Sequence, residues 1–352
     1  MEKRSRINDV AALAKVSTAT VSHVINNTRF VSDEVRKRVL SAIKKLHYFP
    51  SATARSLSTK ETKTVGVIIS DIQNPFYGQL IRGIDGILHK EGYDILLASN
   101  DEDVTKENAY LTTFFSRGVD GIIMAPVNED ISFLEVIESV GTKIVFIDRE
   151  PSNNPFPSIL VNNKSSSKEL INHLIDDGHE RIAIILGLNR STINNRFLGY
   201  KEALMERGIP FNKEFAVVGG SQQHGGYLAA KKLLNMKQKP TAIFTTVNLM
   251  TLGTLKAFHE LGIRCPEDCA LVGFDDTSWA PLFTPPLTTI EQPIKEIGIT
   301  AANSLLEQLK GDDVPNKIEL STKLHVRGSC STKCKNKYSI KREVVEIDEF
   351  PF

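Results

Sequence analysis

The chain lacks the features that mark secreted, membrane-spanning or disordered proteins. Its 352 residues contain no apolar stretch long enough to cross a bilayer, and only four cysteines. The first ten residues are charged and include no apolar segment of the kind that forms a secretion signal. Hydrophobic residues make up 41% and charged residues 24%, as in ordinary globular domains. We therefore expect a cytoplasmic protein of two or three domains with reduced thiols and no membrane partner.

Motifs for catalysis and metal binding are also missing. The sequence has no P-loop, no G-x-S-x-G, no H-E-x-x-H and no convincing G-x-G-x-x-G. Its cysteines form two pairs, Cys265 with Cys269 and Cys330 with Cys334. Neither spacing matches a C-x2-C zinc motif, and His325 adds no evident fourth ligand. We expect no enzyme activity, no metal and no cofactor.

Charge is distributed unevenly along the chain. Residues 1–60 contain twelve Lys and Arg against four Asp and Glu, a balance of +8. The remaining residues carry 31 against 38, a balance of −7. A basic segment on an acidic body is typical of proteins that bind a polyanion such as DNA. A solvated, charged helical surface would give the same counts, so charge alone leaves both interpretations open.

The basic segment shows helical periodicity and no strand pattern. Apolar residues recur at helical spacing in three stretches, with interruptions at 14–17 and 26–27. Two short helices joined by a tight turn predict a helix-turn-helix, whose second helix enters the major groove of DNA. The residues expected on the outward face of that helix are Thr18, Ala19, Ser22 and His23. An ordinary helical hairpin would show the same periodicity.

From residue 64 onward, short β-branched segments alternate with amphipathic helical patterns. The expected strands are 65–69, 95–98, 121–124, 144–147, 182–186, 242–244 and 270–274. The expected helices are 79–89, 109–117, 167–175, 196–205, 227–234 and 252–261. This alternation predicts parallel sheets with helices on both faces, and the number of elements favours two doubly wound lobes. The fold class is therefore α/β, with a small all-helical head and a two-lobed body.

Several motifs, in one order along the chain, resemble the lactose repressor (LacI/GalR) family. Residues 7–26 resemble that family's DNA-binding head, and residues 28–32 and 46–57 are most similar to its purine-responsive branch. Matches to the ligand-binding core are Asp71-Ile-Gln-Asn-Pro-Phe76, Asp148-Arg149, Phe274-Asp275 and Leu287-Thr-Thr-Ile-Glu-Gln292. The resemblance covers about residues 6–330 and implies a body like that of periplasmic binding proteins.

The resemblance also implies domain boundaries. The expected parts are a helix-turn-helix head (1–49), a hinge helix and linker (50–61), an effector-binding and dimerisation domain (62–330) and a C-terminal tail (331–352). Within the body, lobe 1 would comprise about 62–162 and 291–322, and lobe 2 about 163–290 and 323–330.

For DNA binding, the resemblance implies that Thr18, Ala19 and His23 face base edges. His23 offers a single N–H where many members have arginine, and Ala19 offers only a methyl group, so the operator sequence stays open. Leu57, beside Arg55, would wedge into the minor groove where two hinge helices pair, since one such helix is too short to persist alone. An exposed linker leucine is the alternative. Paired hinges imply a homodimer on a near-palindromic operator of double-stranded DNA.

A cleft at the carboxyl ends of the strands is the usual ligand site of such sheets. Sugars require carboxylates, guanidinium or amide groups, and an aromatic face. Residues of these types that follow strands, or that match the family's ligand positions, are Asn74, Phe76, Tyr77, Asp148, Arg149, Arg190, Thr192, Arg196, Asn248, Asp275 and Gln292. The alternatives are a surface ion pair for Arg196, a capping role for Asp148 and a core position for Phe76.

The sequence departs from the purine-responsive pattern at two pocket positions. Ser221 replaces an aromatic residue and Arg149 replaces a tryptophan, so we favour a sugar or sugar acid as the effector over a purine. We expect a sequence-specific DNA-binding transcriptional regulator, a repressor, controlled by that effector. The alternatives are purine-type corepression, control by a partner protein, and a plain solute-binding protein, which would carry a signal peptide and no basic head.

Overall fold

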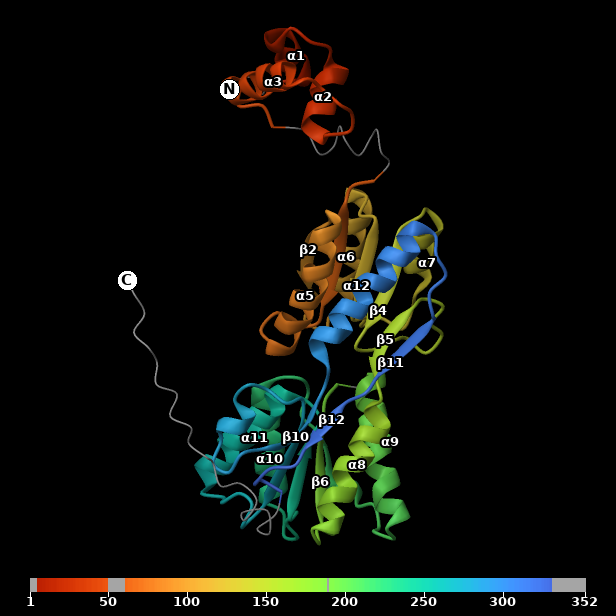
Figure 1. Ribbon diagram of the computed structural model, residues 1–352. Helices are drawn as coiled ribbons and strands as arrows, with labels where there is room; N and C mark the ends of the chain where they lie inside the picture. The colour runs from red at the N-terminus through yellow and green to blue at the C-terminus, as the bar shows by residue number, and fades with distance from the viewer. Residues whose placement is uncertain (1–4, 50–60, 189, 331–352) are drawn as a thin grey trace, which may run out of the picture. The chain divides into compact units, whose positions relative to one another are not determined.

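The computed structural model describes residues 5–49, 61–188 and 190–330 (Figure 1). Backbone contacts divide the chain into two compact units, Met1–Lys63 and Thr64–Phe352, which we call the head and the body. The expected hinge residues Arg55 and Leu57, and the tail beyond residue 330, lie outside the described residues.

All the regular secondary structure described in the head is helical, as the periodicity of its sequence predicts. Its helices are α1 (Ile7–Ala14), α2 (Thr18–Asn26) and α3 (Asp33–Lys45). Helix α2 begins after Ser17, because the Ser17 hydroxyl accepts a hydrogen bond from the backbone N–H of Thr20 at 3.1 Å. The apolar faces of the three helices form one core, in which Val10, Val21 and Val39 are fully buried.

Lobe 1 of the body contains a parallel sheet of six strands in the order β11-β5-β4-β3-β1-β2. These strands are β1 (Thr64–Ile69), β2 (Asp94–Ser99), β3 (Gly121–Met124), β4 (Lys143–Ile147), β5 (Ser158–Val161) and β11 (Lys317–Leu320). Alternate strand residues pack against α5 (Pro75–Leu88) and α12 (Ile294–Lys310) on one face. The other face packs against α6 (Val104–Arg117) and α7 (Ser132–Ser139).

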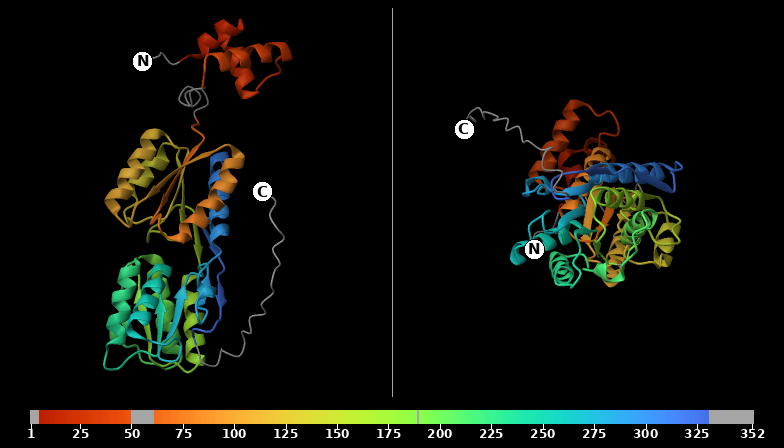
Figure 2. Two further views of the ribbon diagram at one scale, coloured as in Figure 1. Left: turned by 90° about the vertical axis from the view of Figure 1, so that its left-hand side faces the viewer. Right: turned by 90° about the horizontal axis from the view of Figure 1, so that it is seen from below.

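Lobe 2 repeats this architecture of a sheet between helices (Figure 2). Its strand order is β12-β10-β9-β8-β6-β7. Its strands are β6 (Ile182–Leu186), β7 (Ala216–Val218), β8 (Ala242–Thr245), β9 (Ala270–Phe274), β10 (Thr288–Glu291) and β12 (Lys323–His325), of which only β12 is antiparallel to its neighbour. One face is covered by α8 (Asn163–Asp176) and α9 (Ser191–Glu206). The other face is covered by α10 (Gln223–Leu234) and α11 (Asn248–Leu261).

Every strand and helix that the sequence predicts is present, and the doubly wound α/β prediction is confirmed. Elements that the sequence analysis did not anticipate are β5, β7, β10, β11, β12, α7 and α12, with the short 3-10 turns η1 (His89–Glu91), η2 (Lys213–Phe215) and η3 (Ala280–Leu282). In the described part of the chain, no helix is both long enough and apolar enough to cross a membrane.

The chain passes between the lobes at three places along the described body: from β5 to α8, from β10 to α12, and from β11 to β12. These crossings lie near one another, as the paths of β11, β12 and α12 in Figure 1 show. The hydroxyls of Ser166 and Thr322, from two different crossings, are 2.6 Å apart. Short crossings of this kind restrict the lobes to hinge-like rotation.

Candidate functional site

A cavity of about 300 Å³ lies between the lobes, at the carboxyl ends of their strands. Ten of the eleven expected effector residues line it: Asn74, Phe76, Tyr77, Asp148, Arg149, Arg190, Thr192, Arg196, Asp275 and Gln292. The eleventh, Asn248, is not part of the lining. Its side-chain Nδ2 donates a hydrogen bond of 2.9 Å to Oδ1 of Asn74 in the opposite lobe, so it positions a lining residue.

Asp148 and Asp275 occupy equivalent positions in the two lobes. Asp148 follows β4 and Asp275 follows β9, and both have a left-handed backbone, with φ of 66° and 78°. For residues other than glycine this conformation costs about 1–3 kcal/mol, and it concentrates at functional sites. Aspartate tolerates it better than most residues. The result is a carboxylate at the cavity from each lobe.

The Asp275 carboxylate interacts electrostatically with the guanidinium of Arg196, which other contacts hold in place. Oδ1 of Asp275 accepts a hydrogen bond of 2.5 Å from Nε2 of Gln292. Arg196 is 4% exposed, and its guanidinium lies 3.5 Å from the centroid of the Phe274 ring. Arg196 also donates to Oδ1 of Asn163 at 2.8 Å and to the carbonyl of Thr246 at 2.6 Å. This burial excludes the surface ion pair considered from the sequence.

Phe76 combines two of the roles considered for it. Its side chain is 6% exposed and belongs to the core of lobe 1, yet it also lines the cavity. Its ring meets that of Tyr77 edge to face, with centroids 5.0 Å apart. The Tyr77 hydroxyl donates to Oγ of Ser70 at 2.9 Å.

Glu102 is a cavity residue that the sequence analysis missed. Its carboxylate accepts hydrogen bonds from Nη2 of Arg149 at 2.8 Å and from Nε of Arg190 at 3.1 Å, and Arg149 also donates to Ser70. Burial raises the pKa of the Glu102 carboxyl, but the two guanidinium groups outweigh burial and hold the pKa below its usual range. Arg149 therefore has an internal carboxylate partner. The sequence gives only a weak signal for Glu102, its position shortly after β2.

Burial shifts the titration of three other cavity residues. It raises the pKa of the Asp148 carboxyl above its usual range, although Arg149 and Arg196 partly offset the shift. It lowers the pKa of Arg196, against the opposing effect of Asp275 and Asp148. Burial also raises the pKa of Tyr77, which stays a neutral hydroxyl donor at neutral pH. The cavity thus holds one carboxylate, Asp148, that protonates more readily than an exposed aspartate.

Hydrogen bonds join the lobes across the cavity. The pairs are Gln222 Nε2 with Asp71 Oδ2 at 2.9 Å, Arg190 Nε with Glu102 Oε2 at 3.1 Å, and Asn248 Nδ2 with Asn74 Oδ1 at 2.9 Å. Polar groups on both lobes are therefore already in contact. This arrangement is suited to a ligand that both lobes hold at once.

In the head, the outward face of α2 is polar. Thr18 and Ala19 are exposed, and Ser22 and His23 are half-buried. His23 is oriented by Thr28, because its Nδ1 lies 2.8 Å from the Thr28 hydroxyl. Such a face suits insertion into a DNA groove.

A helix-turn-helix head attached to a two-lobed body with a polar cavity defines a ligand-controlled transcriptional regulator. Comparison with known families supports this class in both parts. Residues 6–51 match the family described as bacterial regulatory proteins, lacI family, and residues 171–330 match the periplasmic binding protein-like domain. The chain belongs to the lacI family of bacterial transcriptional repressors.

Similar proteins cover nearly the whole chain. The HTH-type transcriptional repressor PurR of Photobacterium profundum is 35% identical over 326 residues, which are 92% of this chain and 98% of that protein. The ribose operon repressor of Haemophilus influenzae is 37% identical over 306 residues, 86% of this chain and 92% of that protein.

Solved structures of lacI-family regulators are also similar to this chain. The Lac repressor dimer bound to operator and the anti-inducer ONPF has a TM-score of 0.82 and 26% identity, covering 94% of this chain and all 100% of that one. A LacI family regulator from Enterococcus faecium with bound ribose has a TM-score of 0.69 and 28% identity, covering 76% of this chain and 98% of that one.

These comparisons confirm the function predicted from the sequence. The chain is a DNA-binding transcriptional repressor with an effector-binding body. Proteins of its family bind DNA and small-molecule effectors and are not enzymes.

Proposed function

We propose that this repressor responds to a neutral monosaccharide bound between its lobes. The observation that carries the proposal is the pair of carboxylates, Asp148 and Asp275, that reach one cavity from opposite lobes. Each carboxylate has two acceptor oxygens and can bind neighbouring hydroxyls of one sugar ring. Arg196 supplies fixed donors, and Phe76 supplies an apolar face for ring C–H groups. The volume of about 300 Å³ is at the small end of ligand cavities.

The charge of the lining favours a neutral ligand over a sugar acid. The charged residues of the lining are Asp71, Asp101, Glu102, Asp148 and Asp275 against Arg149, Arg190 and Arg196. Carboxylates outnumber guanidinium groups, and Glu102 already accepts hydrogen bonds from two of the arginines. An anionic ligand would have to displace Glu102 or be repelled by the remaining carboxylates.

A purine effector is the competing candidate, because several similar repressors are PurR proteins. Planar bases bind best where aromatic rings can stack on them. Here the rings of Phe76 and Tyr77 are nearly perpendicular, at 86°, so they do not form one flat surface. Ser221, which also lines the cavity, has no ring to offer. We therefore rank the sugar first.

A thermal-shift screen of the full chain tests the effector class, because a ligand that binds only the folded state raises the melting temperature. The panel contains ribose and other neutral pentoses and hexoses, sugar acids, phosphorylated sugars and purine bases. We expect a shift with one or a few neutral monosaccharides, confirmed by calorimetric titration. A shift with purine bases alone, or with acids alone, would refute the proposal.

We propose that the chain acts in the cytoplasm as a homodimer on a near-palindromic operator. Residues 1–49 would bind DNA through Thr18, Ala19, Ser22 and His23 in the major groove, and residues 50–61 would bind through Arg55 and Leu57 in the minor groove. The effector-binding and dimerisation domain would extend over 62–330, with lobe 1 at 62–162 and 291–322 and lobe 2 at 163–290 and 323–330, followed by the tail at 331–352. Selection from a random DNA library should recover inverted repeats with a central pyrimidine–purine step such as CpG. Asymmetric or direct-repeat sites would contradict the paired-head proposal.

The proposed effector releases the repressor from DNA. A ligand can change DNA affinity only if it binds two arrangements of the lobes unequally. The hinge joins lobe 1 at β1, so rotation of the lobes in a dimer would change the spacing of the two hinges. Fluorescence anisotropy of an operator fragment measures this: added effector should lower the operator affinity, and a rise would reverse the proposed sense.

A further inference from the structure

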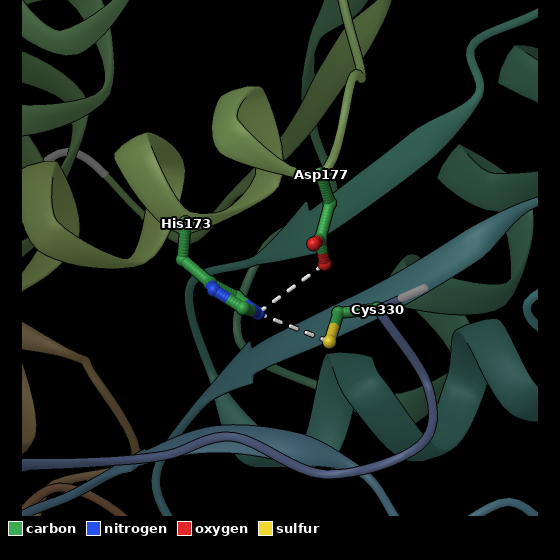
Figure 3. A group of neighbouring side chains, drawn as sticks. All are labelled: His173, Asp177 and Cys330. Carbon is green, nitrogen blue, oxygen red and sulfur yellow. Dashed lines mark hydrogen bonds and ion pairs between the residues drawn. The ribbon is translucent and has the colours of Figure 1, made fainter. Parts of the chain in front are cut away.

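Three potential metal ligands meet in lobe 2, away from the effector cavity. They are His173 in the last turn of α8, Asp177 directly after that helix, and Cys330 at the end of the described chain (Figure 3). Nε2 of His173 lies 3.2 Å from Sγ of Cys330 and 3.5 Å from Oδ2 of Asp177. Cys330 is fully buried, and the His173 and Asp177 side chains are 21% and 17% exposed.

One carboxylate oxygen of this cluster takes no hydrogen bond from the described residues, although the imidazole and the thiol both have partners. Oδ2 of Asp177 is buried and receives no hydrogen bond from the described residues. Nε2 of a neutral imidazole carries either one proton or one lone pair, so it pairs with the sulfur or with the carboxylate and not with both. The Cys330 thiol already has a partner, because Sγ donates to the Arg327 carbonyl oxygen at 3.2 Å, so a cation would have to replace the thiol proton. The imidazole nitrogen, the sulfur of the resulting thiolate and the Asp177 oxygen can each offer that cation a lone pair.

The separations of the imidazole nitrogen from the sulfur and from the carboxylate oxygen suit tetrahedral zinc. With Zn–N of about 2.0–2.1 Å and Zn–S of about 2.3 Å, a tetrahedral site separates its nitrogen and sulfur ligands by about 3.5 Å. The corresponding separation of nitrogen and carboxylate oxygen is about 3.3 Å. The observed 3.2 and 3.5 Å are within a few tenths of an ångström of these values. All three ligand atoms lie within 4.8 Å of one another.

The segment that carries Cys330 is fixed by other contacts, so the sulfur is held in place before any metal binds. Nε2 of His179 lies 2.9 Å from the Cys330 carbonyl oxygen. The preceding residue, Ser329, accepts a hydrogen bond from the Thr288 N–H at 2.9 Å and donates one to the Leu271 carbonyl at 2.5 Å. His173 and Asp177 are four positions apart, which places them on one side of the end of α8.

A second group of possible ligands, Asp276, Glu291 and His325, already has a cationic partner in Arg327. Both oxygens of Asp276 accept hydrogen bonds from Arg327, at 2.6 and 2.8 Å, and Oδ1 also accepts one from Thr289. The guanidinium already supplies the positive charge there, so this cluster is an ion-pair network.

We propose that His173, Asp177 and Cys330 bind one divalent zinc ion that ties the end of α8 to the C-terminal segment of lobe 2. The three protein ligands leave the fourth tetrahedral position for water. Binding releases the thiol proton of Cys330, since the thiolate is the form that coordinates zinc, and affinity therefore rises with pH. The ion would act as a structural clamp, with no part in the effector cavity.

Titration of the full chain with Co²⁺ under reducing conditions tests the site, because Co²⁺ can report the geometry and ligands of a zinc site by its absorption. We expect a thiolate-to-cobalt charge-transfer band and tetrahedral ligand-field bands that saturate at one Co²⁺ per chain and disappear when Zn²⁺ is added. Zn²⁺ should also raise the melting temperature. Absence of the charge-transfer band in the unaltered chain would overturn the proposal, whatever the variants do.

Two variants and a matched control locate the ion. Cys330→Ser should lose the charge-transfer band, and His173→Asn should lose the melting shift with Zn²⁺. His259→Asn removes an exposed histidine from the last turn of α11 and should behave as the unaltered chain. A band that persists in Cys330→Ser would place the metal on another thiol and refute the assignment. Circular dichroism of each variant establishes that it is folded.

Discussion

Replacing Asp275 by asparagine should uncouple the repressor from its effector. Oδ1 of Asp275 is occupied by Gln292, whereas Oδ2 takes no side-chain hydrogen bond from the described residues and is left for the ligand. Asparagine can keep the Gln292 contact through its carbonyl oxygen, but it then presents an N–H₂ group where the sugar needs an acceptor. It also tolerates the left-handed backbone of this position, which alanine does not.

The expected loss follows from the charged hydrogen bond that disappears. Such a bond contributes about 1.5–3 kcal/mol, which is roughly a 10- to 150-fold increase in the effector dissociation constant. Operator affinity without effector should stay within about twofold, because the substitution lies in the body and preserves its backbone. The effector concentration that releases DNA should rise by the same factor as the dissociation constant.

Calorimetric titration of the effector and anisotropy of an operator fragment measure the two quantities separately. Asp312→Asn, an exposed aspartate after α12, is the control for loss of one negative charge and should leave both unchanged. Full effector affinity in Asp275→Asn would show that the ligand does not bind at this carboxylate.

Three further substitutions test other parts of the molecule. Leu57→Ala should weaken operator binding by about 1–3 kcal/mol while nonspecific DNA binding in the same salt is unchanged, and an equal loss on both DNAs would argue against a minor-groove wedge. Glu102→Gln removes the carboxylate that accepts hydrogen bonds from Arg149 and Arg190. Calorimetry should then show the ratio of sugar-acid affinity to neutral-sugar affinity rising about tenfold, and a constant ratio would contradict the charge argument. Because the pKa of Asp148 is raised, effector affinity should fall as mildly acidic pH protonates this acceptor. In Asp148→Asn the effector affinity should be lower but independent of pH over that range. The same decline with pH in the variant would assign the effect to another group.

The sequence predicted the buried centre of each lobe better than its edges. Central strands such as β3 and β9 are short runs of apolar residues with every position buried, and that pattern is visible in the sequence. Strands β11 and β12 contain lysine and have no buried position, so their sequences resemble loops until pairing with β5 and β10 is known. Helix α12 is different: its buried residues recur at helical spacing, so the signal was present.

Ten of the cavity residues were predictable because they follow strands or match the family's motifs. Glu102 follows β2, an edge strand of mixed burial, where the sequence gives little reason to expect a cavity. Its partners Arg149 and Arg190 are 47 and 88 residues away, so their ion pairs emerge only from the fold. The His173, Asp177 and Cys330 cluster has the same origin, since its sulfur is 157 residues from the imidazole.

Asp148 and Asp275, which both have a left-handed backbone, make the cavity depend on both lobes. Since one carboxylate belongs to each lobe, neither lobe alone would carry the complete set of contacts to the proposed ligand, and tight binding would require the closed arrangement. The measured dissociation constant then equals the intrinsic constant divided by the fraction of molecules that are closed. A substitution at a crossing, such as Thr322→Ala at its contact with Ser166, changes that fraction without touching the ligand. The sensitivity of the proposed switch to its effector could therefore be tuned at the crossings, while the residues that would contact the ligand stay the same.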